Sequence, residues 1–217
     1  MRERGRDAVA LAPRAPPPPV CGFRPRWLAA LLAAPALQPG TYLVVSHPLR
    51  FGGWGLTVPV MAQLRVRAAR PTEAHLLSEL ALRSKGHWGY DAEFLRACQA
   101  ELTLSPAEVR DGRFFVVESG RQLLGFYGLD GTPPDGELSN LWVDPGSIGS
   151  GLGRRMWQHA VAAAQQAGFA ALSIDAEPFA EGFYRAMGAE RVGVTASGSV
   201  PGRVLPRLQF WVPGPDA

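Results

Sequence analysis

The sequence of 217 residues has few of the side chains that disulfides and metal ions require. Its two cysteines, Cys21 and Cys98, lie far apart and form no C-x-x-C motif. Its four histidines are scattered and show none of the spacings typical of zinc ligands. We therefore expect no disulfide framework and no metal site. A chain with so few cysteines suits a reducing compartment, so we predict a cytoplasmic location.

Also missing is a hydrophobic run long enough to cross a membrane. The apolar stretch from Trp27 to Leu37 is too short to span a bilayer. Its length would fit the hydrophobic part of a signal peptide. However, the basic segment before it is long and rich in proline, which disfavours export. We expect no membrane partner.

Lysine is nearly absent, and we attribute the single Lys85 to coding bias. Positive charge is concentrated in residues 1–60, where seven arginines accompany two acidic residues. The formal net charge of +3 for the whole chain therefore leaves −2 for the remainder. Binding to nucleic acid requires a basic face on the folded domain, so we expect no nucleic-acid partner.

The composition changes near Met61. Residues 1–60 hold ten of the twenty prolines, including the run from Pro16 to Pro19. Such a segment resists packing and favours extended or disordered conformations. We predict a disordered extension rich in proline and arginine over residues 1–60, or a start of translation at Met61, and a folded domain over residues 61–217.

Hydrophobic periodicity within residues 61–217 predicts a mixed α/β fold. The order of the expected elements gives a mostly antiparallel central sheet with helices on both faces, because one strand–helix–strand unit interrupts a series of hairpins. The segments between these elements, such as 84–91, 105–112, 130–136 and 197–206, are predicted connections, with a short helical turn as the alternative within 105–112. The expected strands are 63–68, 113–118, 122–129, 138–143, 170–175, 190–194 and 208–212, and the expected helices are 70–83, 92–102, 152–166 and 179–187.

A glycine-rich loop joins one of these strands to the longest predicted helix. Gly149, Gly151 and Gly153 alternate just before the alanine-rich segment 152–166. Unpaired N–H groups and the helix dipole make a helix N-terminus suitable for phosphate, and glycine lets the backbone approach it closely. The loop predicts a phosphate or pyrophosphate site, although a simple turn fits the same pattern. It matches neither the P-loop motif nor the dinucleotide-binding unit.

Three features together carry a family resemblance. Leu-Trp-Val-Asp-Pro at 141–145 precedes Gly-Ser-Gly-Leu-Gly at 149–153, similar to a strand and a [QR]-x-x-G-x-[GA] pyrophosphate loop. Ala-Glu-Gly-Phe-Tyr-Arg-Ala-Met-Gly-Ala at 180–189 is similar to an A-x-x-F-Y-x-x-x-G-F helix. The order of elements over 62–213 also agrees. In these respects the sequence resembles the GNAT superfamily of acyl-CoA-dependent N-acetyltransferases.

The resemblance implies that acetyl-CoA, as co-substrate, lies where the central strand and the strand after the long helix splay apart. An amine then attacks the thioester directly. No metal takes part. The resemblance assigns cofactor binding to Leu141, Trp142, Val143, Ile148, Gly149, Ser150, Gly151, Leu152, Gly153 and Arg154.

Two residues match catalytic positions of the family. Tyr184 takes the position of the acid that protonates the departing thiolate, and Glu137 takes that of the base in several members. A chain of water molecules is the alternative base. Ile148 stands where Gln or Arg is usual, and Glu177 where Asn is usual, which leaves open a non-catalytic acyl-CoA-binding module.

The acceptor is the least constrained part of the prediction. The segments that bind the acceptor in the family contribute His87, Trp88, Tyr90 and Arg203 here. Arg203 would suit a substrate carboxylate. We expect a small-molecule primary amine, with a peptide as the alternative, because the domain has no acidic run suited to basic peptides. Members are often dimers, so a homodimer is an open possibility.

Overall fold

The computed structural model describes residues 42–43 and 64–214, which belong to one compact unit. Most of the predicted N-terminal extension lies outside the described residues. The exception is β1 (Tyr42–Leu43), a two-residue strand that pairs antiparallel with β2 (Leu64–Ala68).

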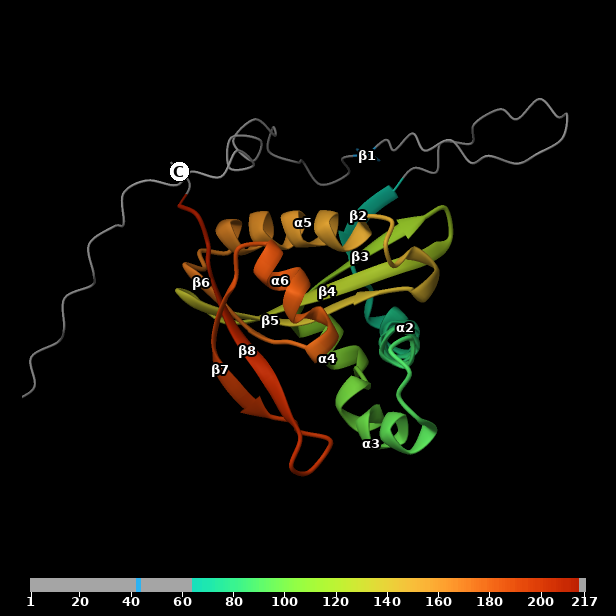
Figure 1. The fold of residues 1–217 in the computed structure, drawn as a ribbon. Helices are drawn as coiled ribbons and strands as arrows, with labels where there is room; N and C mark the ends of the chain where they lie inside the picture. The colour runs from blue at the N-terminus through green and yellow to red at the C-terminus, as the bar shows by residue number, and fades with distance from the viewer. Residues whose placement is uncertain (1–41, 44–63, 215–217) are drawn as a thin grey trace, which may run out of the picture. The chain divides into compact units, whose positions relative to one another are not determined.

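One mixed sheet forms the centre of the described chain (Figure 1). Its strands lie in the order β1-β2-β3-β4-β5-β6-β8-β7. Every neighbouring pair is antiparallel except β5 and β6, which are parallel, so the predicted fold class is confirmed. The remaining strands are β3 (Arg113–Ser119), β4 (Gln122–Thr132), β5 (Asp135–Val143), β6 (Ala171–Asp175), β7 (Glu190–Ala196) and β8 (Val204–Trp211).

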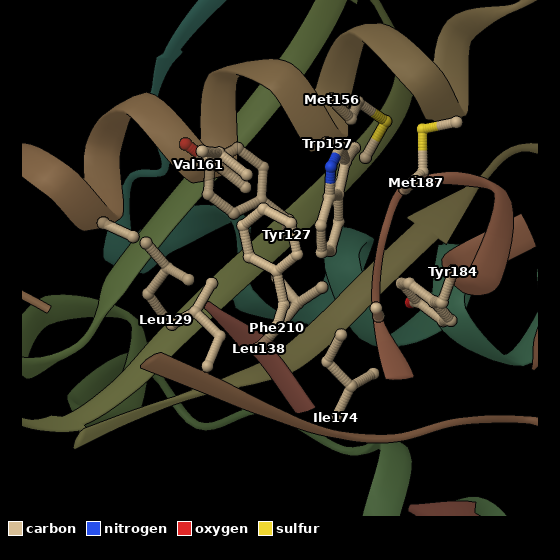
Figure 2. Close-up of a cluster of buried hydrophobic side chains, with 14 of the residues drawn as sticks. Tyr127, Leu129, Leu138, Met156, Trp157, Val161, Ile174, Tyr184, Met187 and Phe210 are labelled. Carbon is tan, nitrogen blue, oxygen red and sulfur yellow. The ribbon is translucent and has the colours of Figure 1, made fainter. Parts of the chain in front are cut away.

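Helices cover both faces of this sheet. On one face α5 and α6 pack on the strands, and Figure 2 shows Trp157 and Val161 of α5 close to Tyr127 of β4. On the other face α2, α3 and α4 pack around Phe114 and Phe126. Both faces of the central strands are therefore buried. The helices are α2 (Ala74–Gly86), α3 (Ala92–Leu102), α4 (Pro106–Asp111), α5 (Leu152–Gln166) and α6 (Glu181–Ala186), with single 3₁₀ turns at Pro71–Glu73, Pro145–Ser147 and Pro178–Ala180.

Two helices have the bounds that the sequence predicted. For α3 the cap is Asp91, whose carboxylate accepts a hydrogen bond of 2.8 Å from the N–H of Phe94. For α5 the cap is Gly151, in the left-handed conformation at φ +85°. These ends were predictable for two reasons. Each cap residue is of a type that favours that position, and neither helix contains glycine or proline after its first turn.

The structure agrees with the short helical turn within 105–112: residues 106–111 form α4, which is capped by Ser105. Two other predicted connections are wrong. Residues 130–136 form the end of the β4–β5 hairpin, in which Asp130 pairs with Glu137 and only Pro133 and Pro134 lie outside the strands. The last strand begins at 204 rather than 208. Pro206 lies within it, opposite Val194, and its carbonyl accepts a bond from the N–H of Ala176. Proline inside a strand argues against that strand in a sequence.

We predict that Leu172→Ala lowers the free energy of unfolding by about 2–5 kcal/mol, because this side chain is fully buried between the sheet and α5. Urea unfolding measures the loss. The control is Val192→Ala on β7, where the side chain is 59% exposed, and we expect a change within about 0.5 kcal/mol. Equal losses in the two variants would contradict the assignment of this core.

Candidate active site

A cleft opens where β5 and β6 separate. The two strands pair at only three positions, from Asp135–Ala171 to Glu137–Ser173. Ser139 forms a β-bulge against β4 just after the last pair, and such a bulge bends its strand and increases its twist. From Leu138 onward the edge of β5 that faces β6 has no strand partner among the described residues. The cleft has a volume of about 980 Å³.

The glycine loop and the N-terminus of α5 form one end of this cleft. Gly149 and Gly151 both have positive φ, at +83° and +85°, and a Cβ added at either would meet no atom within 4 Å. The N–H groups in the first turn of a helix have no partner within the helix. Arg154 in that turn adds a cation to the cleft wall. This end can therefore hold a phosphate group.

Most of the predicted cofactor residues line the cleft. They are Leu141, Trp142, Val143, Ile148, Gly149, Gly151, Gly153 and Arg154. The other two do not belong to the lining. Leu152 is buried in the core under α5, and the hydroxyl of Ser150 donates to the carbonyl of Ser147 at 2.7 Å.

Tyr184 of α6 lies in the wall of the cleft, on the side of β6. Its residue is 6% exposed, and its ring packs edge-on against Trp157 and Phe183. The hydroxyl has no hydrogen-bond partner in the described part of the chain. Burial raises the pKa of the phenol above its ordinary value, so the group keeps its proton at neutral pH.

Glu137 is half-buried on β5 at the point where the cleft begins. It pairs in register with Asp130 of β4, and Asp175 of β6 faces it from the other side. Burial is the main cause that raises the pKa of this carboxyl, and the charges of Asp175 and Asp130 add to it. Arg207 opposes these effects. Glu137 itself is not part of the cleft lining, although Leu138 and Ser139 are.

A buried ionic network centred on Glu177 forms another part of the cleft wall. The carboxylate of Glu177 accepts bonds from Lys85 at 2.9 Å and from Tyr90 and Arg203. Arg203 also donates to the hydroxyl of Tyr90 at 2.8 Å. Burial opposes ionisation of Glu177, but the bonds from Tyr90 and Lys85 hold its pKa below the ordinary value. Burial and the bond to Glu177 raise the pKa of Tyr90 to about 12.

This network defines what two of the predicted acceptor residues do in the fold. Tyr90 and Arg203 are engaged with Glu177 rather than with open space. Trp88 lines the cleft and stacks on Phe179 with ring centroids 5.2 Å apart. His87 is exposed and meets Trp88 edge-on. Of the four residues, Trp88 alone belongs to the cleft lining.

Sequence reasoning missed the role of Lys85. It is the only lysine of the chain, and it is buried at 6% exposure against Glu177. The departure from Asn at Glu177 was the signal that could have found it. A buried carboxylate needs a cationic partner, and a lone lysine near the end of a helix was an available one.

These features define a mixed α/β fold in which the sheet splays beside a glycine-rich helix N-terminus. The model of the Acetyltransferase (GNAT) family matches residues 75–189, more than half of the chain. The protein therefore belongs to the GNAT family of acetyltransferases, and the resemblance seen in the sequence is confirmed. No curated protein matches the sequence.

Solved structures with the same fold are distant in sequence. PaiA N-acetyltransferase from Thermoplasma acidophilum, in complex with coenzyme A, has a TM-score of 0.57 at 15% identity and covers 68% of this chain and 98% of its own. The structure of yncA from Salmonella typhimurium, with its cofactor acetyl-CoA, has a TM-score of 0.51 at 17% sequence identity. The match covers 71% of this chain and 96% of the yncA chain. The ribosomal-protein-S18-alanine N-acetyltransferase from Escherichia coli has a TM-score of 0.53 at 14% sequence identity. The match covers 71% of this chain and 98% of that protein's chain.

Within residues 64–214, no helix combines the length and the apolar character that crossing a membrane requires.

We predict that Asp175→Asn lowers the pKa of Glu137 toward its ordinary value, because one of the two negative charges that face this carboxyl is removed. NMR titration of the labelled glutamate carboxyl carbons measures the change. The control is Glu79→Gln, an exposed position on α2 outside the cleft lining. An unchanged titration of Glu137 in Asp175→Asn would show that the two groups do not interact.

Proposed function

We propose that the protein transfers an acetyl group from acetyl-CoA to a primary amine of a small acceptor. The observation that carries this proposal is the cleft between β5 and β6, which has a helix N-terminus at one end and the unpaired hydroxyl of Tyr184 in its wall. Both an anion site and a proton donor thus face one space.

The residues of the cleft suit acetyl-CoA. The N–H groups from Gly149 to Arg154 would hold the pyrophosphate, since a Cβ at Gly149 or Gly151 would meet no protein atom and the space there is free. The backbone of Leu141 and Val143 on the unpaired edge of β5 would bond the amides of the pantetheine arm. The bound thioester supplies the acetyl group. Ile148 contributes only apolar contact where the family usually has a polar side chain.

Glu137 supports removal of a proton from the acceptor ammonium. A base near neutral pH is more effective when its pKa lies above that of an ordinary carboxyl, and burial with two like charges has this effect here. Glu137 lies just behind the cleft lining, so we propose that one water molecule carries the proton to it. This arrangement joins the two candidate bases, carboxylate and water, in one path.

Tyr184 supports the second proton transfer. The amine nitrogen forms a bond to the thioester carbonyl carbon, and the carbon–sulfur bond breaks. Tyr184 then gives its proton to the departing sulfur, and its raised pKa keeps that proton available beforehand. The hydroxyl has no partner in the described residues, so no competing bond holds the proton back.

We predict that Gly151→Val weakens the binding of acetyl-CoA by about tenfold or more, because valine disfavours positive φ and disturbs the N–H groups of the loop. Isothermal titration calorimetry measures the affinity. The control is Gly120→Val in the β3–β4 turn, which has φ +60° and equally free space but lies outside the cleft lining. If both variants bind alike, the cradle lies elsewhere.

We predict that Tyr184→Phe lowers the rate of thiol release by about 10²-fold or more with little change in affinity for acetyl-CoA, because only the proton donor is removed. A thiol reagent follows turnover with a panel of amines. The matched control is Tyr127→Phe, a buried tyrosine whose hydroxyl contacts His159 outside the cleft.

Three results would contradict the proposal at different points. Unchanged turnover in Tyr184→Phe would remove its role as the acid. Tight binding of acetyl-CoA without thiol release for any amine would favour the non-catalytic module. Failure to bind acetyl-CoA in a folded sample would remove the cofactor assignment.

A further inference from the structure

Carboxylates make up most of the charged side chains that line the cleft. They come from separate segments that the fold brings together. Only two cations belong to the lining in the described residues, and one of them, Lys85, is already paired with Glu177. The other, Arg154, lies in the first turn of α5. The carboxylates of the lining are Glu101, Glu108, Asp111, Asp130, Asp175 and Glu177.

Some of these groups already have partners. Glu108 caps α4 through Ser105, and Asp175 lies 3.5 Å from Arg207. Asp111 and Asp130 have no ion-pair or hydrogen-bond partner within residues 64–214. They are therefore available to a ligand.

Strand register places three carboxylates on the same face of the sheet. Asp130 lies directly opposite Glu137, and Glu137 directly opposite Ser173. Asp175 follows Ser173 by two residues, so its side chain shares that face. Arg207 is paired opposite Asp175 and is the cation that this row contains. The excess of negative charge lies beside the candidate base.

Two hydroxyls that line the same cleft point to a ligand independently of these charges. Ser84 is 5% exposed and Tyr184 is 6% exposed, and both belong to the lining. Neither hydroxyl bonds to another group in the described chain. Each residue is largely buried while its hydroxyl oxygen stays open to the cleft, so both groups are suited to bond something that enters it.

The walls between the charged groups are apolar. An alkyl chain can lie against them without leaving a polar atom unpaired. Apart from Arg154 at the glycine loop, the described lining offers no unpaired cation to a substrate carboxylate, which disfavours an acceptor that carries one. The apolar residues concerned are Leu102, Leu104, Phe114, Leu138 and Leu205.

Building on the proposed transfer, we propose that the acceptor is an aliphatic diamine or polyamine. One nitrogen loses its proton and faces the acetyl group, while a second ammonium group binds Asp111 and Asp130. The alkyl chain between the two nitrogens contacts the leucine-rich wall. A small molecule is favoured over a peptide, because the cleft of about 980 Å³ must hold the pantetheine arm as well.

The test compares acceptors that share one alkyl chain and differ at its far end. Putrescine carries a second ammonium, butylamine a methyl group and γ-aminobutyrate a carboxylate. We expect kcat/KM for putrescine to exceed that for butylamine by about tenfold or more, since bonds to charged groups contribute that much. We expect γ-aminobutyrate to be the poorest of the three. Spermidine and a lysine-rich peptide complete the panel.

Two variants locate the selectivity. Asp111→Asn and Asp130→Asn are each expected to lower the putrescine-to-butylamine ratio of kcat/KM several-fold. This ratio cancels changes in the shared chemistry, including any effect of Asp130 on Glu137. The control Glu79→Gln removes an exposed carboxylate outside the cleft lining and leaves the ratio unchanged.

The outcomes separate this inference from the proposed function. Acetylation of amines with no preference for putrescine or spermidine, or with γ-aminobutyrate preferred, would overturn the inference and leave the transfer reaction intact. A higher kcat/KM for the peptide would overturn it in favour of a protein acceptor. Acetyl-CoA binding with no acetylation of any amine would overturn both. A diamine preference that persists in Asp111→Asn and Asp130→Asn would overturn the assignment of the site.

Discussion

Three residue pairs between β5 and β6 determine where the cleft lies. The two strands run parallel and bond only from Asp135 to Glu137, and the bulge at Ser139 turns β5 away immediately afterwards. The unpaired edge of β5, the N-terminus of α5 and the wall from α6 all face the space that results. A longer β5–β6 ladder would close this space and leave α5 without an open N-terminus. The separation of β5 and β6 therefore creates the space that the groups lining the cleft share.

The cleft combines two opposite electrostatic environments. At one end, backbone N–H groups and Arg154 favour an anion. Elsewhere in the lining, carboxylates from five segments favour a cation. Neighbouring walls are fixed by the buried network in which Glu177 holds the end of α2 and the loops that carry Tyr90 and Arg203. An anionic co-substrate and a cationic acceptor can therefore enter the same cleft from chemically different sides.

Local signals predicted much of the fold. The bounds of α3 and α5 were correct because caps are set by single residues such as Asp91 and Gly151. The sequence predicts a loop at 130–136, the tip of the β4–β5 hairpin, because the polar residues and Pro133-Pro134 there are typical of a loop. The acidic part of the cleft lining could not be predicted, since its carboxylates are far apart in the sequence and form no run. Only the strand register brings Asp130, Glu137 and Asp175 together.

Two carboxylates in this cleft region have opposite behaviour for reasons that the contacts explain. Glu177 has three donors around it, so its pKa is lowered in spite of burial, and it remains a fixed anion that holds the wall. Glu137 is buried too, but its neighbours are like charges, so its pKa is raised. A group of the first kind binds protein cations, and one of the second kind exchanges a proton readily. In the proposed reaction, the acidic surroundings that would attract an ammonium group are the same ones that raise the pKa of Glu137.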